Sequence, residues 1–565
     1  MAHPPKVLVV TGGLISSTEK SIFNALKRWI SQFSNAQAAW LDFKVKLVVA
    51  ESLVGLALER MCLRFRRRTV RDALHRLSAS KQSETPSLTE VVMMTLLAEQ
   101  NIPFEVTTLD ALYRDSAKAD RLLEGTDCVF LSTTYLHDLS ELEPVIRRMK
   151  RTHNRIVLGG AMVGAIHDRW EGMPEIDIVA IGYGELLFQS LGEWLHSDFQ
   201  VLRPPATGRI VEKKWSRFLF SGVPLTKDLD FLQRPDWSLA SRIHQRPFQM
   251  IYYESVRGCP YRCSFCNYPY LFDDKKFRYK SAERMAADWE HYISTMGVEY
   301  ITCLDSLFTM PRQRLHAFCK ILIEREIRVK WICYARADDL ADEETVVLMK
   351  AAGAHQVQIG IESGDPELLQ NMNKQCSVEA NRRALKNCRR HGLTTVVSLI
   401  VGFPGETEQS LARTYDFLHA NPPDFYFLAI FSTRIPGVPI LQPEMKRRFG
   451  LHVMDNLHSM APYWRHDTMS CAEAGENVRK LDQRLMRNRV ALNAVLFYAG
   501  MLSYHSEMRD PLLDFQQRVA SKPMLRKFFD IANRWVDHRM TRDMSEVFDD
   551  PLEVADQVAT SPPSL

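Results

Sequence analysis

Three cysteines within eight residues constrain this chain of 565 residues more than any other feature. Cys259, Cys263 and Cys266 follow the apolar run Met250–Tyr253 and the breaker pair Arg257-Gly258. Thiolates this close on one loop can converge on one metal centre. A structural zinc site usually takes four protein ligands, and no fourth Cys or His stands at zinc spacing nearby. An iron–sulfur cluster also normally takes four thiolates, so a triad leaves one iron open to an outside ligand. The alternative is three buried, inert cysteines.

The spacing Cys-x3-Cys-x2-Cys, with the aromatic Phe265 directly before the last cysteine, resembles the signature of the radical S-adenosylmethionine (SAM) superfamily. In that family the open iron chelates the amino acid end of SAM. The resemblance implies a [4Fe-4S] cluster with Cys259, Cys263 and Cys266 as its metal ligands, and SAM bound beside Phe265.

Composition gives no sign of a nucleic-acid or membrane partner. The chain is 46% hydrophobic and 25% charged, with a formal net charge of +4. The basic run at 64–68 is interpreted as a solvated helix face, and no apolar stretch reaches the ~18 residues of a bilayer span. The start does not resemble a signal peptide. Eleven irregularly spaced cysteines indicate a reducing compartment, so we expect a cytoplasmic protein.

Apolar runs alternate with helical patterns over residues 1–200. The runs lie at 7–10, 104–106, 128–131, 156–158 and 176–181, and helical patterns include 88–100 and 139–151. This order predicts a doubly wound, Rossmann-like α/β domain whose ligand lies beyond the carboxyl ends of the strands. Small and hydroxyl residues follow those strands, and such residues let a large planar ligand approach backbone amides. Taken alone, a Gly-Gly pair after a strand can equally be a tight turn.

In their order these loops resemble the cobalamin-binding domain that precedes many radical SAM domains. The match is to a Ser-Thr loop, a Gly-Gly loop and a final Gly-x-Gly-Glu. The histidine loop that gives cobalt a lower ligand in other cobalamin proteins is absent, and residues 11–17 occupy its place. The resemblance therefore implies base-off cobalamin without a protein histidine ligand. It assigns cobalamin contacts to Thr11, Gly12, Ser132, Thr133, Thr134, Tyr135, Gly159, Gly160, Ala161, Gly182, Gly184 and Glu185.

Two further segments of the first half of the chain carry no assigned chemistry. Residues 35–85 are predicted as a mainly helical insertion that either caps the lower face of cobalamin or serves packing alone, and packing is favoured. Residues 201–249 contain prolines at 204, 205, 224 and 235 and are predicted as an irregular linker between two domains.

Strand candidates recur over residues 250–440, at 250–253, 298–304, 329–334, 355–361, 395–401 and 425–430. They predict a partial (β/α)6, TIM-like barrel with its active site at the carboxyl ends of the strands. Polar residues gather at those ends. Asp305 could equally be a helix cap, whereas a carboxylate such as Glu362 at the top of a strand is costly unless paired. The family comparison assigns SAM contacts to Asp305, Ser306, Arg336, Glu362, Ser398 and Val401, in addition to Phe265.

Residues 441–565 are predicted as a mostly helical domain, with helices at 477–502 and 524–540 and a frayed end at 558–565. The stretch 462–470 resembles a Trp-x-His-x-Thr-Met stretch that follows the barrel in cobalamin-dependent relatives. Tyr463, Trp464 or His466 could therefore act in the site or pack at a domain interface. The remaining cysteines lack metal-ligand spacing, so no second cluster is expected.

The resemblance covers about residues 5–440 and implies a cobalamin-dependent radical SAM C-methyltransferase. One SAM would methylate cobalamin, and a second would be cleaved to a 5′-deoxyadenosyl radical that activates a substrate carbon. Polar methyl transfer, as in the family's tryptophan methyltransferase of thiopeptide biosynthesis, stays open. So do cyclisation, rearrangement or oxidation with the same cofactors, and a sensor without catalysis. The expected partners are a small-molecule or peptide substrate from natural-product biosynthesis and an electron donor such as flavodoxin or ferredoxin. No catalytic residue is assigned.

Overall fold

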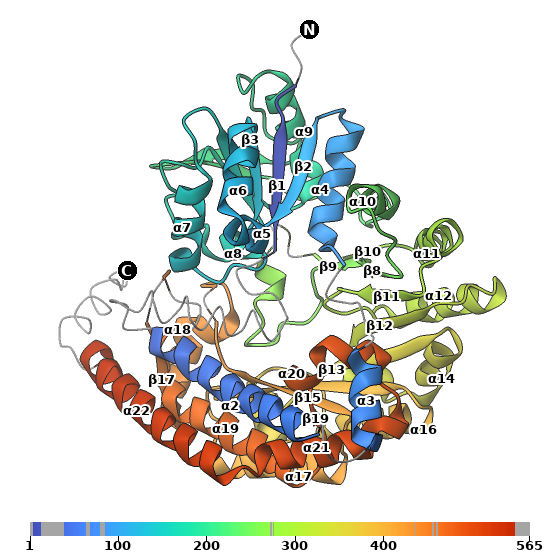
Figure 1. Ribbon diagram of the computed structural model, residues 1–565, viewed down its shortest axis with the longest axis vertical. Helices are drawn as coiled ribbons and strands as arrows, with labels where there is room; N and C mark the ends of the chain where they lie inside the picture. Colours follow the sequence, from blue (N-terminus) through green and yellow to red (C-terminus); the bar gives the residue numbers. More distant parts are fainter. Residues whose placement is uncertain are drawn as a thin grey trace, which may run out of the picture.

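The computed structural model describes residues 4–12, 39–63, 68–78, 85–271, 274, 276–433, 435–454, 457–458 and 462–548. Two sheets of mainly parallel strands, each with its own helices, form two halves of the molecule that face each other (Figure 1). Most of the basic run at 64–68 and the end predicted to be frayed lie outside the described residues. Among the helices described, none is long and apolar enough to cross a membrane.

The first half is a seven-stranded sheet in the order β2-β1-β3-β4-β5-β7-β6. Its strands are β1 Val7–Thr11, β2 Phe104–Thr108, β3 Cys128–Ser132, β4 Arg155–Gly159, β5 Ile178–Ile181, β6 Arg209–Glu212 and β7 Arg217–Phe220. β1 to β5 are the five predicted strands and run parallel to one another. β1 and β3 are buried along their whole length, which explains why they read as continuous apolar runs.

Helices follow the strands of this sheet. They are α4 Leu88–Glu99, α5 Leu109–Arg114, α6 Ser116–Glu124, α7 Leu139–Met149, α8 Ala161–Ile166 and α9 Gly184–His196. The helices predicted at 88–100 and 139–151 are confirmed as α4 and α7. Each begins at a side chain that accepts a backbone N–H of the first turn, Ser87 in α4 and Asp138 in α7.

The linker predicted over residues 201–249 is wrong in part. β7 pairs parallel with β5 and antiparallel with β6, so residues 209–220 extend the first sheet. Strands of four residues are too short to show a clear alternating pattern in the sequence. The short helix α10 Trp237–Ile243 follows, capped by Asp236. The first half therefore ends near residue 221 and not at 200.

The second half is built on seven parallel strands in the order β8-β11-β12-β13-β14-β15-β19. They are β8 Met250–Tyr253, β11 Tyr300–Cys303, β12 Lys330–Ala335, β13 Ala354–Glu362, β14 Thr394–Val401, β15 Phe425–Ile430 and β19 Leu492–Asn493. The first six are the predicted strands of the partial barrel. Val357, Ile359 and Ile361 of β13 join the core shared with the helices, so the alternate residues Gln358, Gly360 and Glu362 face the barrel interior.

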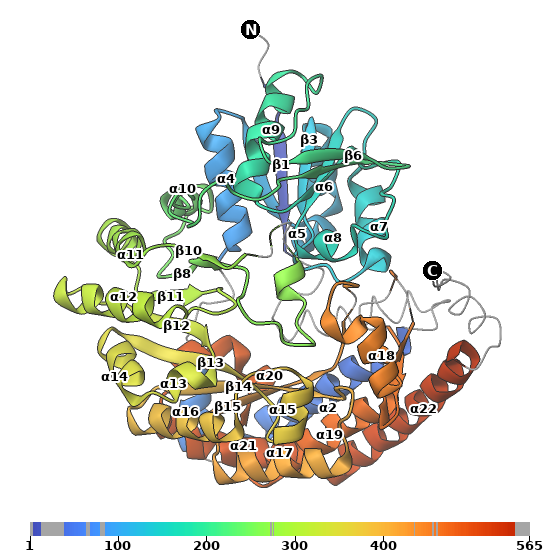
Figure 2. The ribbon, with the colours of Figure 1, turned by 180° about the vertical axis from the view of Figure 1, so that it is seen from behind.

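Helices cover the outer face of these strands (Figure 2). They are α11 Ala282–Met296, α12 Arg312–Glu324, α13 Ala337–Leu340, α14 Glu343–Ala351, α15 Pro366–Asn371, α16 Val378–Arg390 and α17 Glu408–Ala420. A small antiparallel hairpin, β9 Val256–Arg257 with β10 Arg278–Tyr279, and the 3-10 turn η2 Tyr268–Tyr270 flank the cysteine loop.

The C-terminal part is helical but does not form a separate domain. Its elements are η3 Pro439–Leu441, α18 Pro443–Phe449, β16 His452–Val453, β17 Trp464–His466, β18 Met469–Ser470, α19 Cys471–Arg487, α20 Ala494–Phe497, η4 Tyr498–Ser503, η5 Ser506–Met508, α21 Arg509–Ala520 and α22 Pro523–Phe548. The helix predicted at 477–502 is wrong beyond residue 487. The chain turns at Arg489, whose φ is +53°, and the apolar run that follows enters the sheet as β19. The helix predicted at 524–540 is confirmed within α22.

The predicted insertion is helical, but it belongs to the second half of the molecule. Its helices are α2 Ala39–Leu63 and α3 Arg68–Ser78. α2 packs against α19, α21 and α22, and α3 packs against α21 and η4. Figure 1 shows α2 running across the second half. The buried amine of Lys44 lies 2.8 Å from Asp537 of α22 and 3.4 Å from Glu476 of α19. The described residues of the insertion therefore serve packing.

We expect Lys44→Met to weaken the attachment of α2. The Lys44 side chain is 0% exposed, while its two partners are 26% and 23% exposed. Breaking a fully buried pair costs ~3–5 kcal/mol, and partly exposed partners lower the expected loss to about 2–3 kcal/mol. Urea unfolding followed by tryptophan fluorescence measures this loss. The exposed Arg71→Met of α3 is the matched control, and equal midpoints for the two variants would contradict the assignment.

Candidate functional site

The two halves meet through the carboxyl ends of their strands. In Figure 1 the carboxyl end of β1 points toward the second half. After β5, Glu185 accepts two hydrogen bonds from Arg257, at 2.7 and 2.8 Å, and this guanidinium lies 4.9 Å from the ring centroid of Tyr183. Burial would raise the pKa of Glu185, but Arg257 outweighs burial and lowers that pKa. Arg257 stands two residues before Cys259, so the contact lies beside the cysteine loop.

A glycine begins the cysteine loop because nothing larger fits there. Gly258 follows β9 with a φ of +76°, and a Cβ at this position would lie 2.2 Å from the carbonyl oxygen of Lys276. Only glycine allows this backbone conformation and this approach without strain. The chain can therefore leave the β9–β10 hairpin directly into Cys259.

The far side of the loop is fastened to two other segments, at residues 372–373 and at 440. The Ser264 amide donates to the carbonyl of Met372 at 2.8 Å, and Asn373 Nδ2 donates to the carbonyl of Arg262 at 2.9 Å. The Ile440 amide in turn donates to the carbonyl of Ser264 at 3.0 Å. These bonds hold the loop backbone, so the positions of the three thiols are set by the protein.

The chemistry of the three thiols fits an iron–sulfur cluster. All three cysteines are free, and burial raises the pKa of Cys259 and raises that of Cys266 to about 12. Iron binds thiolates, so cluster assembly would release these protons. Within the described residues, no three His, Cys, Asp or Glu side chains stand close enough to hold a single metal ion.

A buried ion pair stands beside the thiols. Lys374 Nζ lies 2.8 Å from Glu362 Oε1, and both side chains are 9% exposed. Burial would lower the pKa of Lys374, but Glu362 and Cys263 raise it. Glu362 has a φ of +63° at a bulge of β13, and a Cβ on Gly360 would lie 2.3 Å from its carboxylate. Strained backbone of this kind persists only where surrounding structure fixes it, often at functional sites.

Arg336, a second predicted SAM residue, supports the loop from another side. Its guanidinium lies 3.7 Å from the ring centroid of Tyr261, which belongs to the cysteine loop. It also donates to the carbonyls of Lys374 and Gln375, at 2.8 and 3.0 Å. Arg336 and Lys374 act to lower the pKa of Cys259, but burial outweighs them and raises it.

Asp305 and Ser306 hold the turn before the cysteines. Asp305 is fully buried and accepts from the Ser255 amide, the Val256 amide and the Ser255 hydroxyl, at 2.6 to 2.9 Å. Burial raises the pKa of Asp305 to about 6. Ser306 Oγ donates to the carbonyl of Gly258 at 3.2 Å. Their observed partners are the protein's own backbone, and direct SAM contacts from these two residues stay a prediction.

The other predicted SAM residues lie on two strands and the loop. Ser398 pairs in register with Gly360 on the inner face of the barrel, next to the Glu362–Lys374 pair. Phe265 is half-buried, with its ring centroid 6.4 Å from that of Phe403. Val401, by contrast, packs in the core on the helix side, so only its backbone can face a ligand. The structure thus brings most of the predicted SAM residues to one end of the barrel.

The loops predicted to bind cobalamin lie together at one edge of the first sheet. Thr133 is buried and donates to the carbonyl of Gly159 at 2.9 Å, which joins the loops after β3 and β4. Gly160 has a φ of +106°, and a Cβ there would lie 2.9 Å from the amide of Thr134. Thr134, Tyr135 and Gly160 are exposed, so a ligand can reach the backbone here.

The remaining cobalamin candidates flank these loops. Thr11 donates to Glu90 at 2.5 Å and is buried, while Gly12 follows it with a φ of +74°. Gly184 is exposed, and a Cβ on it would meet nothing within 4 Å. Ser132 donates to Thr134 at 3.1 Å. Ala161 begins α8, and Gly182 has a φ of +109°. The structure brings the set to one edge, although Glu185 is engaged by Arg257.

The stretch after the barrel packs against the ends of β14 and β15. The Trp464 indole donates to the carbonyl of Phe431 at 2.9 Å and stacks on His466, with ring centroids 5.3 Å apart. His466 Nε2 lies 3.2 Å from the carbonyl of Gly402. Tyr463, Trp464 and His466 are all buried, so the packing alternative is favoured over a direct site role.

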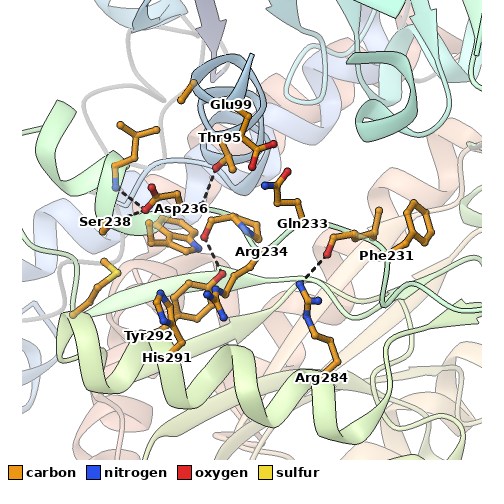
Figure 3. Close-up of a pocket in the computed structure, with 16 residues that line it drawn as sticks. Thr95, Glu99, Phe231, Gln233, Arg234, Asp236, Ser238, Arg284, His291 and Tyr292 are labelled. Atoms are coloured by element: carbon orange, nitrogen blue, oxygen red, sulfur yellow. Dashed lines mark hydrogen bonds between the residues drawn. The ribbon is translucent and has the colours of Figure 1, made fainter. Parts of the chain in front are cut away.

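Cavity size alone does not mark the site. A cavity of about 920 Å³ lies between α4, the connection at 231–239 and α11 (Figure 3). Thr95 and Glu99 line it from α4, and His291 and Tyr292 from α11. Its lining contains none of the cysteines of the triad and none of the residues predicted to bind SAM or cobalamin.

Sequence reasoning missed three residues that build the site, namely Lys374, Arg257 and Tyr261. Lys374 lies twelve residues after its partner Glu362, across α15, and no motif links the two. Arg257 was noted only as part of a breaker pair, although a cation next to a metal-binding loop is a signal worth testing. Tyr261 lies between the first two cysteines, and nothing in the motif indicates that its ring would contact Arg336.

Comparison with known proteins agrees with the cysteine motif. Residues 253–418 match the family model of the radical SAM superfamily. The anaerobic magnesium-protoporphyrin IX monomethyl ester cyclase of Rubrivivax gelatinosus is 26% identical over 278 residues, 49% of this chain and 48% of that protein. The bacteriochlorophyllide d C-12(1)-methyltransferase of Chlorobaculum tepidum is 26% identical over 381 residues, 66% of this chain and 76% of that protein. The chain spans about half the length of the cyclases that it matches.

Solved structures extend the likeness beyond the barrel. The cobalamin-dependent SAM radical enzyme OxsB, with aqua-cobalamin bound, has a TM-score of 0.54 and 15% identity over 81% of this chain and 78% of its own. The radical SAM methyltransferase TsrM from Kitasatospora setae, with cobalamin and a [4Fe-4S] cluster, has a TM-score of 0.52 and 17% identity over 66% of this chain and 76% of its own. The chain thus contains a radical SAM domain in a fold that cobalamin-dependent radical SAM enzymes share.

We expect Lys374→Met to destabilise the protein by about 3 kcal/mol, because Glu362 would keep a buried charge without a partner. The double variant Glu362→Gln/Lys374→Met should recover most of this loss. Urea unfolding of both variants, with the exposed Lys386→Met as the matched control, measures the coupling. Equal losses in the single and double variants would show that the pair is not coupled.

Stability should fall as pH rises because of Glu406. Burial raises the pKa of Glu406 to about 8, from an ordinary value of 4.5, although the Gly402 amide donates to it. The native protein therefore binds more protons than the unfolded chain between these values, and stability is lost as pH rises toward 8. Glu406→Gln should remove a share of this loss on the order of a few kcal/mol. Thermal midpoints from pH 5 to 9 test this, with exposed Glu408→Gln as control; parallel curves for all three proteins would refute it.

Proposed function

We propose that this protein is a cobalamin-dependent radical SAM methyltransferase that moves a methyl group from SAM to a carbon of its substrate. One observation carries the proposal. The exposed loops after β3 and β4, at Thr134, Tyr135 and Gly160, face the same region as the cysteine loop, between the strand ends of the two halves. The Glu185–Arg257 contact spans the two sets beside the cysteines. A methyl carrier and a radical source must both reach one substrate atom, and this arrangement supports the expectation that their sites share one space.

The chain's own residues suit the roles expected of them. When bound, the cluster would supply an electron to cleave SAM. SAM would supply the methyl group, and cobalamin would carry it. Cys259, Cys263 and Cys266 would hold the cluster. Lys374, whose amine faces both Glu362 and the thiols, would neutralise negative charge beside them. Exposed Thr134, Gly160 and Gly184 would offer backbone amides and carbonyls to cobalamin, without a histidine beneath the metal.

The likeness to known proteins supports methyl transfer over other outcomes. A bacteriochlorophyllide methyltransferase is among the relatives, and TsrM, which shares the fold, is a methyltransferase with a tryptophan substrate. We expect a small-molecule or peptide substrate and a cytoplasmic electron donor such as flavodoxin or ferredoxin. A second candidate function is cyclisation or oxidation with the same cofactors, which the likeness to the cyclases favours.

The test is anaerobic reconstitution with iron, sulfide and hydroxocobalamin, followed by paramagnetic resonance and mass spectrometry. Methyl transfer predicts a reducible four-iron cluster, a base-off cob(II)alamin signal and a labelled product from SAM with a deuterated methyl group. A substrate converted without label would favour the second candidate. A cluster with no bound cobalamin would overturn both.

Cys263→Ala should abolish the cluster but leave cobalamin binding largely unchanged. The cysteine loop lies in the second half, whereas the exposed loops after β3 and β4 belong to the first sheet. Iron content and cobalamin absorbance, measured on the purified variant, separate the two. Loss of both cofactors in a folded variant would contradict the division between the halves.

A further inference from the structure

At one of the two edges of the partial barrel, within the described residues, a strand covers only part of β15. β14 pairs with all six residues of β15, from Phe425 to Ile430. On the other side, β19 pairs with Phe425 and Tyr426 only. An uncovered strand edge exposes unpaired backbone groups, which proteins usually shield with a helix or loop. Here α2 runs beside the edge, and a cavity of about 300 Å³ remains between them.

The lining of this cavity is apolar. α2 contributes Leu41, Val45, Val48 and Val49, which face residues 426–432 of β15 and its end. The charged side chain among the lining residues, Asp482, accepts from Tyr426 Oη at 2.6 Å and from Asn493 Nδ2 at 2.7 Å. Burial raises the pKa of Asp482 to about 6. The polar side chains at this end therefore bond one another, and the other lining side chains are mainly apolar, beside Ser432 and the backbone edge of β15.

The cavity adjoins the space where the reaction is expected. Phe427 lines it and pairs in register with Ser398, which pairs in turn with Gly360 under the Glu362–Lys374 ion pair. Phe427 is 43% exposed although it lies on the inner face of the barrel. Phe427 thus exposes an apolar ring between the ion pair and the cavity. A ligand that covered this ring would remove it from water.

Tyrosines line the neighbouring wall of the barrel. Tyr252 of β8 and Tyr334 of β12 occur at inward positions, and Tyr498 comes from η4. Burial, followed by the proximity of Tyr498 and Tyr135, raises the pKa of both Tyr252 and Tyr334. Tyr135 belongs to the loop after β3, so this aromatic wall continues across the two halves. Neutral phenols suit an uncharged ligand with some polar groups.

We propose that the cavity between α2 and β15 binds an uncharged, apolar group of the substrate, such as an alkyl chain or a single fused-ring system. This inference rests on the proposed function for its placement beside the reacting atoms. At about 30 Å³ per water-sized group, the cavity holds about ten non-hydrogen atoms. The substrate class is thus a molecule with one apolar arm, whose reacting carbon lies outside the cavity near Ser398.

The probe for this site is 1-naphthol, an uncharged ring system of about the required size, titrated into anaerobically reconstituted protein by calorimetry. For so small a ligand we expect a Kd on the order of 0.1 mM. Val45→Phe and Val49→Phe fill the cavity from α2, and each should weaken binding by about tenfold or more, the loss of one good apolar contact. Ala57→Phe, on the exposed face of the same helix, is the matched control and should bind as the native protein does.

Phe427→Ala provides an independent variant, because truncating an exposed ring leaves the fold intact while removing one wall of the cavity. It should also weaken 1-naphthol binding. Unchanged affinity in Val45→Phe, Val49→Phe and Phe427→Ala, or no binding by the native protein, would overturn the proposal. SAM cleavage and cobalamin binding are measured on the same samples. Because neither requires the cavity, their loss or retention reports on the proposed function separately.

Discussion

The buried ion pair between Glu185 and Arg257 fixes the geometry on which the rest of the site depends. Removing two charges from water is expensive, so such a pair adds little net stability. The pair instead fixes an orientation, because two parallel hydrogen bonds to Glu185 hold the Arg257 guanidinium in one position. Because Arg257 ends β9 and Gly258 follows it, this orientation also sets where the cysteine loop begins. This contact therefore ties the first sheet to the start of the cysteine loop, and the hydrogen bond from Tyr183 Oη to Asp274 ties it to the segment after the cysteines.

The path of the chain reinforces this contact. β1 lies in the first sheet, the next described segments, α2 and α3, lie in the second half, and α4 returns to the first. Along the sequence, the chain thus passes from the first half to the second, back to the first, and again to the second. Separating the halves would require Lys44 and the apolar face of α2 to leave the core around α19 and α22. The two halves are therefore defined by their sheets and not by two consecutive stretches of the sequence.

How much of this could be predicted depended on the length and burial of each element. Most parallel strands were predicted because helices bury both faces of the first sheet and the outer face of the barrel, which leaves apolar runs in the sequence. β19 was missed because it has only two residues, and β6 and β7 because they lie in a stretch whose prolines predicted an irregular linker. The cysteine triad was predicted because its ligands are neighbours in sequence. Lys374 was not, because its pairing with Glu362 exists only after α15 folds between them. The Gly-x-Gly-Glu motif predicted a cobalamin contact for Glu185, whereas the partner that the structure shows is Arg257 from the other half.

The shape of the reaction space follows from the incomplete barrel. A closed barrel fills its interior with side chains from every strand, and it then has no room for a large substrate. An open sheet has room, but the part of β15 that β19 does not cover must be shielded from water and from other chains. A helix can shield that edge, yet its side chains cannot interdigitate with a strand edge as a paired strand would. The space left between α2 and β15 is therefore a direct consequence of how the edge is covered. The insertion that links the two halves is thus also a wall of the interior, so changes at its partly buried cavity residues, Val45 and Val49, should alter what enters the barrel.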